Sequence, residues 1–133
     1  MRVVGAEDTP PRRSPAGFGQ RVRVLASRAP GLAVRTGMVE VDVAPGAAVS
    51  SHDHGDAEAL VYVVAGSARF SSGGRSEPVA GGGLVHVPLG EEVAIANAGP
   101  DTLRLLVVLT PGGYERRFLD WDPTGHPVSP TAA

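Results

Sequence analysis

Two histidines, His52 and His54, are the part of the sequence best suited to chemistry. In an extended strand, residues i and i+2 project to the same side, so the two imidazoles would face one ligand together. Glu58 follows after the short stretch 55–57, and a carboxylate there would complete a face of two histidines and one carboxylate. That donor set is typical of non-haem iron(II) sites with open coordination positions. The alternative is that residues 52–54 form a solvated turn.

The composition excludes several other kinds of site. The sequence has no Cys, which excludes a thiolate nucleophile, a disulfide and a cysteine-ligated metal. All 12 basic residues are Arg, which excludes Schiff-base chemistry and a P-loop lysine. The net charge is −2 and the Arg residues are dispersed along the chain. We therefore expect a small-molecule substrate as partner, and neither nucleic acid nor a membrane.

Short strands joined by turns would have to position these residues. The chain of 133 residues contains 18 Gly and 12 Pro, and no segment holds a helical apolar period. This length predicts one domain, and the pattern predicts a mainly β architecture, a sandwich or a barrel of the jelly-roll kind. The expected strands are 21–25, 33–43, 48–53, 60–65, 68–71, 84–87, 93–96 and 103–109.

The two ends of the chain differ from its middle. Residues 1–20 are rich in Pro, Gly and charge, and we expect an N-terminal arm that lies on the domain or on a partner. The barrel domain is expected over 21–121, with a short turn or helix at 112–121. Residues 122–133 are expected to be a flexible tail in which His126 is exposed. The start of the sequence lacks the apolar core of a signal peptide, which, with the absence of Cys, predicts a cytoplasmic protein.

Two spaced motifs resemble those of the cupin family, and the resemblance covers residues 33–118. The residues on the first motif are Gly46, His52, His54, Glu58 and Gly66. Those on the second motif are Gly82, Pro88, Gly90 and Asn97. The segment TPGGYERRF at 110–118 is also similar to the end of quercetinase-like small cupins. The sequence departs from the family at one ligand position, where Val93 replaces the last histidine.

The resemblance implies an all-β fold, a double-stranded β-helix (jelly-roll) barrel, and a homodimer built from exchanged edge strands. It also implies a divalent metal in the barrel mouth, held by His52 and His54 with Glu58 or His86 as further ligands. Iron is the favoured metal, with zinc, manganese and nickel as alternatives. In this fold the strand of His86 runs beside the strand of Val93, so its imidazole could reach the site. The alternative is a half-buried strand histidine that is hydrogen-bonded locally.

The register of Glu58 allows two interpretations. Seven residues separate it from Gly66, where the family commonly has six, and Ala59 occupies the stricter position. Because side chains alternate along a strand, this shift turns a side chain to the opposite face. Either a β-bulge before Leu60 returns Glu58 to the interior, or Glu58 is an exposed carboxylate at the start of a strand.

Three further residues are candidates for contact with a substrate: Tyr62, Val93 and Arg116. Tyr62 lies in an expected strand, where packing in the core is the alternative role. Val93 stands at the ligand position where the sequence departs from the cupin pattern. Arg116 is followed by Arg117 and stands beside Tyr114 and Phe118. The two arginines could clamp a carboxylate at the barrel mouth, or form a charged edge or a dimer contact.

The sequence thus predicts a metal-dependent cupin enzyme that acts on a small organic substrate. Positions left open on the metal would serve oxygenase, isomerase or cyclase chemistry in a barrel that excludes water. Val93 at a ligand position supports an alternative, a non-catalytic or metal-free cupin that binds a small molecule. A third interpretation is a metal-free acid–base site, with His52 or His54 as the proton carrier.

Overall fold

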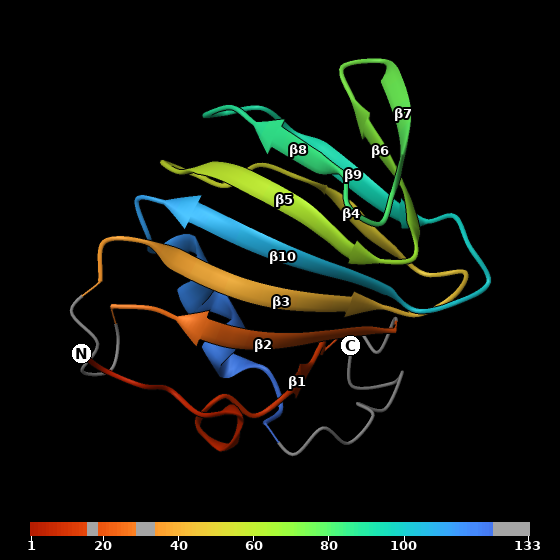
Figure 1. Cartoon of the computed structure of the whole chain (residues 1–133). Helices are drawn as coiled ribbons and strands as arrows, with labels where there is room; N and C mark the ends of the chain where they lie inside the picture. The colour runs from red at the N-terminus through yellow and green to blue at the C-terminus, as the bar shows by residue number, and fades with distance from the viewer. Residues whose placement is uncertain (16–18, 29–33, 124–133) are drawn as a thin grey trace.

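Two antiparallel sheets face each other in this protein (Figure 1). The computed structural model describes residues 1–15, 19–28 and 34–123, so the tail 124–133 with His126 lies outside the described residues. The six-stranded sheet has the order β1 (Arg12–Arg13), β2 (Gln20–Ala26), β3 (Gly37–Val43), β10 (Leu103–Thr110), β5 (Glu58–Ala65) and β8 (Leu84–Val87). The four-stranded sheet has the order β4 (Ala48–His52), β9 (Val93–Asn97), β6 (Ser67–Ser72) and β7 (Arg75–Ala80).

Side chains that alternate along the strands build the core between the two sheets. In β10, Leu103, Leu105, Val107 and Leu109 are buried, and the residues at the alternate positions between them face outward. β3 repeats the pattern with buried valines at alternate positions. Burying an aliphatic side chain of this size stabilises the fold by about 1.5–3 kcal/mol. The all-β prediction is therefore confirmed, because the alternation that predicts the strands also forms the core.

The hairpin strand β7 is absent from the strands that the sequence predicts. Almost every side chain of β7 is exposed, so the segment shows no apolar alternation. It forms because Gly73 and Gly74 turn the chain with φ of +55° and +78°, values that favour glycine. β7 pairs with β6 alone, and Pro78 is tolerated in such an edge strand.

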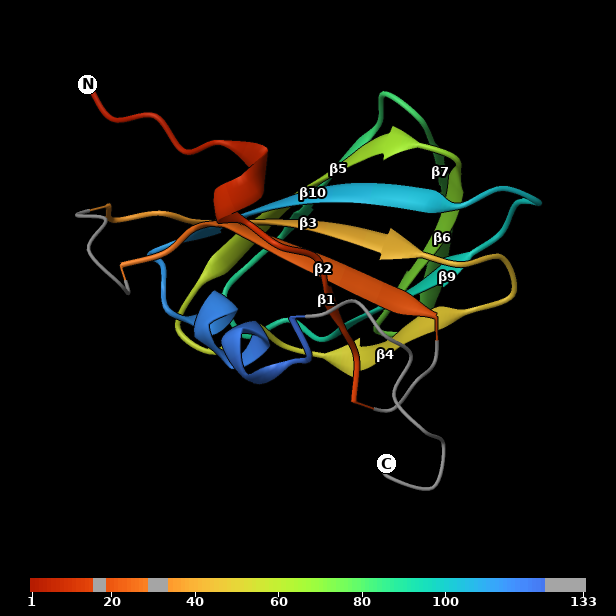
Figure 2. The same cartoon turned by 90° about the horizontal axis from the view of Figure 1, so that it is seen from below.

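Of the two 3₁₀ helices in the described ranges, η1 (Ala6–Asp8) and η2 (Tyr114–Asp120), the second follows β10 in the region where a short turn or helix is expected. It packs against β2 and β3 and lies near the end of β4, at one end of the two sheets (Figure 2). Gly113 precedes it with φ of +145°, in the region that favours glycine. Within the described ranges, no helix is long and apolar enough to cross a membrane.

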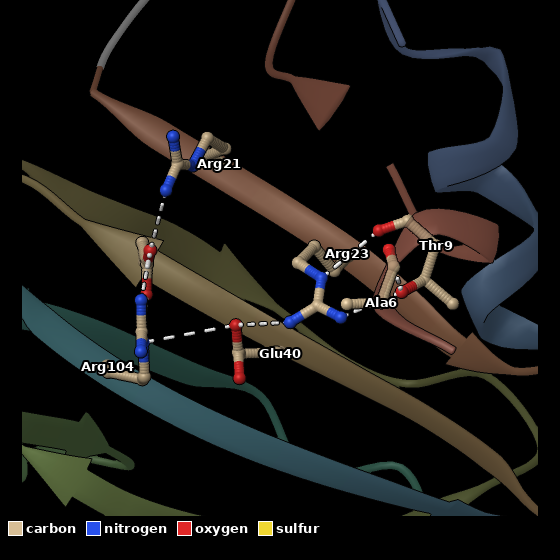
Figure 3. Close-up of polar contacts among 7 residues, drawn as sticks. Ala6, Thr9, Arg21, Arg23, Glu40 and Arg104 are labelled. Atoms are coloured by element: carbon tan, nitrogen blue, oxygen red, sulfur yellow. Dashed lines mark hydrogen bonds and ion pairs between the residues drawn. The ribbon is translucent and has the colours of Figure 1, made fainter. Parts of the chain in front are cut away.

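Part of the N-terminal arm lies on the domain rather than away from it. Arg23 on β2 donates from Nε to the carbonyl oxygen of Thr9 (3.1 Å) and from Nη2 to its hydroxyl (2.8 Å) (Figure 3). Arg12 on β1 donates from Nη1 to the carbonyl oxygens of Leu119 (2.9 Å) and Trp121 (3.2 Å). These bonds join the arm to β2 and to the last turn of η2.

The charged side chains of Arg21, Arg23, Glu40, Asp42 and Arg104 form a ladder on the outer face of the six-stranded sheet, part of which Figure 3 shows. Arg21 lies 3.4 Å from Asp42 and Arg23 lies 3.3 Å from Glu40, each across the β2–β3 pair. Arg104 on β10 donates to Asp42 at 2.8 and 3.1 Å and lies 3.9 Å from Glu40. These partly exposed pairs are each worth about 0.2–1 kcal/mol.

Candidate functional site

His52 is the last residue of β4 and faces the interior because of an irregularity in that strand. Its partner across the ladder is Val93 on β9, which is 2% exposed, and cross-strand partners share a face of the sheet. Val49 also pairs with an inward residue, Ile95, although three positions separate Val49 from His52. The register shifts between Val49 and His52, and such a bulge lets both side chains point inward.

His54 follows the end of the strand and is positioned by a turn. The amide of Gly55 donates to Oδ1 of Asp53 (2.8 Å), and Gly55 has φ of +62°. The amide of Ala57 donates to the carbonyl oxygen of His54 (3.2 Å). His54 is only 6% exposed as a result. The turn, rather than strand pleating, places its imidazole inside the barrel.

The structure brings the two imidazoles together and adds the ring of Tyr114. The ring centroids of His52 and His54 are 4.8 Å apart, with an angle of 80° between the ring planes. The Tyr114 ring lies 5.1 Å from that of His54 and 6.2 Å from that of His52. Tyr114 is the first residue of η2, so the site joins the end of β4 to the start of η2.

Hydrogen bonding leaves nitrogen atoms of both histidines free for a ligand. Nδ1 of His52 lies 2.7 Å from the carbonyl oxygen of Ser50. Since a carbonyl only accepts, Nδ1 must carry the proton, and Nε2 of a neutral His52 has a lone pair. Nδ1 of His54 is buried and has no hydrogen-bond partner among the described residues. Leaving such a group unpaired costs about 1–3 kcal/mol.

Burial keeps the His54 imidazole and the Tyr114 phenol uncharged at neutral pH. It is the main reason that the pKa of His54 falls from 6.5 to about 4, and the nearby His52 lowers it further. Burial also raises the pKa of the Tyr114 phenol, which Arg117 partly opposes. The Arg117 guanidinium lies over the Tyr114 ring at 3.5 Å and is exposed. A ligand would therefore meet a neutral imidazole at His54 and a neutral phenol, with one cation at the rim.

The low pKa of His54 predicts that the protein loses stability in mild acid. Between pH 6.5 and pH 4 the unfolded chain binds a proton at His54 that the folded chain excludes, so the free energy of unfolding falls as the pH falls. We expect a loss of about 2–3 kcal/mol across this window. Urea unfolding, measured at a series of pH values from 7.5 to 4, gives the free energy of unfolding of the wild type and of His54→Phe. The wild type should lose more stability than the variant, because the phenyl ring of the variant does not titrate. Parallel stability curves for the two proteins would contradict it.

Glu58 and His86 lie apart from the histidine pair, on the outer face of the six-stranded sheet. Oε2 of Glu58 and Nε2 of His86 are 3.5 Å apart, and both side chains are about half exposed. The β5–β10 register runs without a break from Glu58 through Leu60, so no bulge turns Glu58 inward. Ala59, at 0% exposure, takes the interior position. The structure thus corrects the expectation that Glu58 or His86 joins His52 and His54.

The three expected substrate contacts lie in three different environments. Tyr62 is 41% exposed and faces outward on β5, neither in the core nor at the histidine pair. Val93 faces the interior opposite His52. Arg116 is exposed on η2, whereas its neighbour Arg117 contacts Tyr114. Of the three, only Val93 adjoins the pair.

Two residues of this region were not assigned a role from the sequence: Tyr114 in the site and Glu115 beneath it. Tyr114 stands 60 positions after His54, and no spacing rule links the two. Glu115 is fully buried, although a Glu in a polar segment predicts an exposed side chain. The Gly112–Gly113 pair before them is the one local signal of a special turn.

The donors at this site do not fit a metal held by four protein ligands. Two imidazoles are present, but alanine and valine fill the interior at positions 59 and 93. Within the described ranges, no group of three or more His, Cys, Asp or Glu side chains could hold a metal ion. Catalytic metal sites commonly use three protein ligands and leave one position open. The two histidines fall short of that number.

Known proteins share this fold. A predicted oxalate decarboxylase from Thermotoga maritima aligns with a TM-score of 0.64 and 23% identity, over 83% of this chain and 99% of its own. The Cnp3 cupin domain of Schizosaccharomyces pombe aligns with a TM-score of 0.68 and 17% identity, over 87% and 80%. The oxalate decarboxylase of Lactobacillus farciminis aligns with a TM-score of 0.70 and 24% identity, over 81% of this chain and 32% of its own.

These identities are too low to transfer an activity, but they establish the double-stranded β-helix fold. No curated protein matches the sequence itself. The family model described as "Cupin domain" matches residues 39–109, which include His52 at the end of β4 and His54 in the turn that follows. On this match and this fold, the chain belongs to the cupin family.

Proposed function

We propose that this cupin binds a small organic molecule in the barrel mouth, with His52, His54 and Tyr114 as its polar contacts and without a resident metal. The observation that carries the proposal is the buried Nδ1 of His54, which has no hydrogen-bond partner among the described residues. A ligand that bonds to this nitrogen would offset the cost of burying it unpaired. The interior residues Ala59 and Val93 would supply the apolar part of the pocket.

The chemistry of the site favours a neutral ligand with polar hydrogens. Nε2 of a neutral His52 is an acceptor, and the Tyr114 hydroxyl both donates and accepts. The neutral His54 imidazole offers no positive charge to an anion at pH 7. A hydroxyl, an amide or an amine beside an apolar body would match these groups.

A screen of small molecules against tag-free protein tests the proposal. Compounds that bind should shift the NMR signals of the His54 ring and raise the melting temperature. We expect the rise in melting temperature to disappear in His54→Phe, which keeps a ring and removes the nitrogen atoms. The matched control is His86→Phe on the outer face, where binding should persist. Ligands that bind His54→Phe as well as the wild type would overturn the proposal.

The second candidate is the metal-dependent enzyme, an oxygenase, isomerase or cyclase. The hydrogen bond from Nδ1 of His52 to Ser50 favours it, because metal-ligating histidines typically donate their other nitrogen to such a carbonyl. Elemental analysis of protein purified without a tag and without added metal distinguishes the two candidates. About one equivalent of iron, zinc, manganese or nickel, lost in His52→Ala, would favour the enzyme.

We further propose that the protein acts as a homodimer through the outer face of β5 and β8. Exposed apolar side chains gather there, on two paired strands: Leu60, Tyr62, Val64 and Leu84. Exposed apolar groups on one face are typical of contact surfaces between proteins. The charge ladder occupies the other half of this face, so the apolar half is the better match for a second copy.

Tyr62→Glu is expected to convert the dimer to a monomer. The change places a charge at the centre of the apolar half of the face, where desolvating it would cost more than the contact gains. Light scattering at micromolar concentration measures the mass of each species. Arg75→Glu on the exposed strand β7 is the control and should leave the mass unchanged. A wild-type protein that is monomeric at that concentration would contradict the proposal.

A further inference from the structure

The position of Tyr114 over the histidine pair depends on how η2 is attached to the barrel. The helix has seven residues, too few for a 3₁₀ helix to be stable by itself. Its last turn is attached to β1, because Arg12 on that strand donates to the carbonyl oxygens of Leu119 and Trp121. Its first turn, which carries Tyr114, needs a different attachment.

That attachment is the side chain of Glu115, which points away from solvent beneath η2. Glu115 is 0% exposed. Its Oε2 accepts a hydrogen bond from the hydroxyl of Ser27 (3.1 Å), which follows β2. Its Oε1 accepts from the amide of Gly113 (2.7 Å). One carboxylate therefore binds both the start of η2 and the six-stranded sheet.

Two glycines leave the space that this carboxylate occupies. A Cβ atom on Gly37, the first residue of β3, would overlap the Glu115 carboxylate. A Cβ on Gly112 would lie 3.1 Å from Oε1 and closer still to the backbone of Gly37. The amide of Gly112 also donates to the carbonyl oxygen of Arg35 (2.7 Å). Because neither glycine has a side chain, the start of β3 and the turn before η2 leave room for the Glu115 carboxylate.

We propose that Glu115 is a positioning residue, which holds the first turn of η2 on the barrel so that Tyr114 covers His54. Glu115 touches neither imidazole in the described contacts and acts through its neighbour Tyr114. The inference goes beyond the proposed function, since it holds whether the histidine pair binds an organic molecule or a metal. According to this proposal, the site is assembled through the hydrogen bond between Ser27 and Glu115, which are 88 positions apart in the sequence.

Chemical modification of the histidines tests this assignment. Diethyl pyrocarbonate acylates accessible, unprotonated imidazoles, and mass spectrometry of peptides measures the rate at each histidine. In the wild type His54 should react slowly, because it is buried under Tyr114, while the half-exposed His86 reacts readily. His86 is far from η2 in the sheet order, and it serves as the internal reference in every sample at protein concentrations low enough to keep the proposed β5–β8 dimer dissociated.

Two variants of Glu115 separate its polar role from its volume. Glu115→Leu has a similar size but no acceptor, and we expect the rate at His54 relative to His86 to rise about tenfold or more. Glu115→Gln keeps an oxygen for the Gly113 amide, and its NH₂ can donate to the Ser27 hydroxyl, which is also an acceptor. Glu115→Gln should therefore react as the wild type does. The fluorescence of Trp121, the single tryptophan, should show greater quenching by acrylamide in Glu115→Leu alone.

A control variant separates opening of η2 from general loss of stability. Leu103→Ala creates a cavity at the opposite end of β10, so it weakens the barrel without touching η2. Its His54 rate should remain at the wild-type value well below its melting temperature. Ser27→Ala, a milder change, replaces Glu115→Leu if that variant does not fold, and should raise the His54 rate severalfold. An unchanged rate in the folded variants, or a rise in Glu115→Gln or Leu103→Ala, would overturn the proposal.

Discussion

The double variant Ala59→Glu/Val93→His is expected to bind Zn²⁺ or Ni²⁺ at least about a thousandfold more tightly than the wild-type chain. Both positions face the interior, Val93 directly opposite His52. The two new side chains would raise the number of protein ligands from two to four, the number typical of closed structural sites. Competition with a chelator, followed by isothermal titration of tag-free protein, measures the change in affinity.

The stability of this double variant should depend on metal. A buried glutamate with no partner destabilises the metal-free protein, and metal binding to the folded state alone reverses the loss. Ala94→His is the matched control, because it adds a histidine one residue further on and on the opposite face of β9. It should bind metal no better than the wild type. Equal affinities in the double variant and in Ala94→His would mean that positions 59 and 93 do not share a site with the histidine pair.

Gly37→Ala is expected to reduce the free energy of unfolding by about 2–4 kcal/mol, a large effect for one methyl group. The added Cβ would overlap the Glu115 carboxylate, which packed neighbours prevent from moving. Gly99→Ala is the control, since its Cβ would meet Ser67 at an ordinary 3.5 Å. Urea unfolding followed by circular dichroism measures both variants.

The cost of Gly37→Ala should depend on the side chain at position 115. Once Glu115→Ala has removed the carboxylate, the methyl group at position 37 has room, and its added cost should fall below about 1 kcal/mol. The double-mutant cycle would then give a coupling energy of about 1–3 kcal/mol. Additive effects would show that the two residues do not compete for the same space.

Much of the barrel can be predicted because its strands carry a pattern of period two. β3, β8 and β10 alternate between interior and exterior, and their predicted ranges overlap the observed ones. The same alternation also predicts which face of β5 the Glu58 side chain occupies. Counting back from Gly66 places Ala59 in the family's register, and the alternation of β5 keeps that register.

The rest of the site could not be predicted, because contacts distant in sequence create it. Tyr114 reaches the histidine pair through the docking of η2, which involves Glu115 and Ser27. No local pattern indicates that a glutamate will be buried, since its environment comes from other strands. No sequence pattern predicts the bulge before His52 either, yet this bulge determines which face of β4 that histidine occupies.

The charge ladder on the outer face restricts how β2, β3 and β10 can align. Sliding one strand by two residues keeps every apolar side chain on the interior face, so the core tolerates that error in part. The ladder does not, because Arg21 and Arg23 meet Asp42 and Glu40 together in one alignment only. A slipped strand would leave an arginine and a carboxylate unmatched. These exposed ion pairs therefore favour the correct strand alignment over slipped ones, although their small energies add little to the stability of the finished barrel.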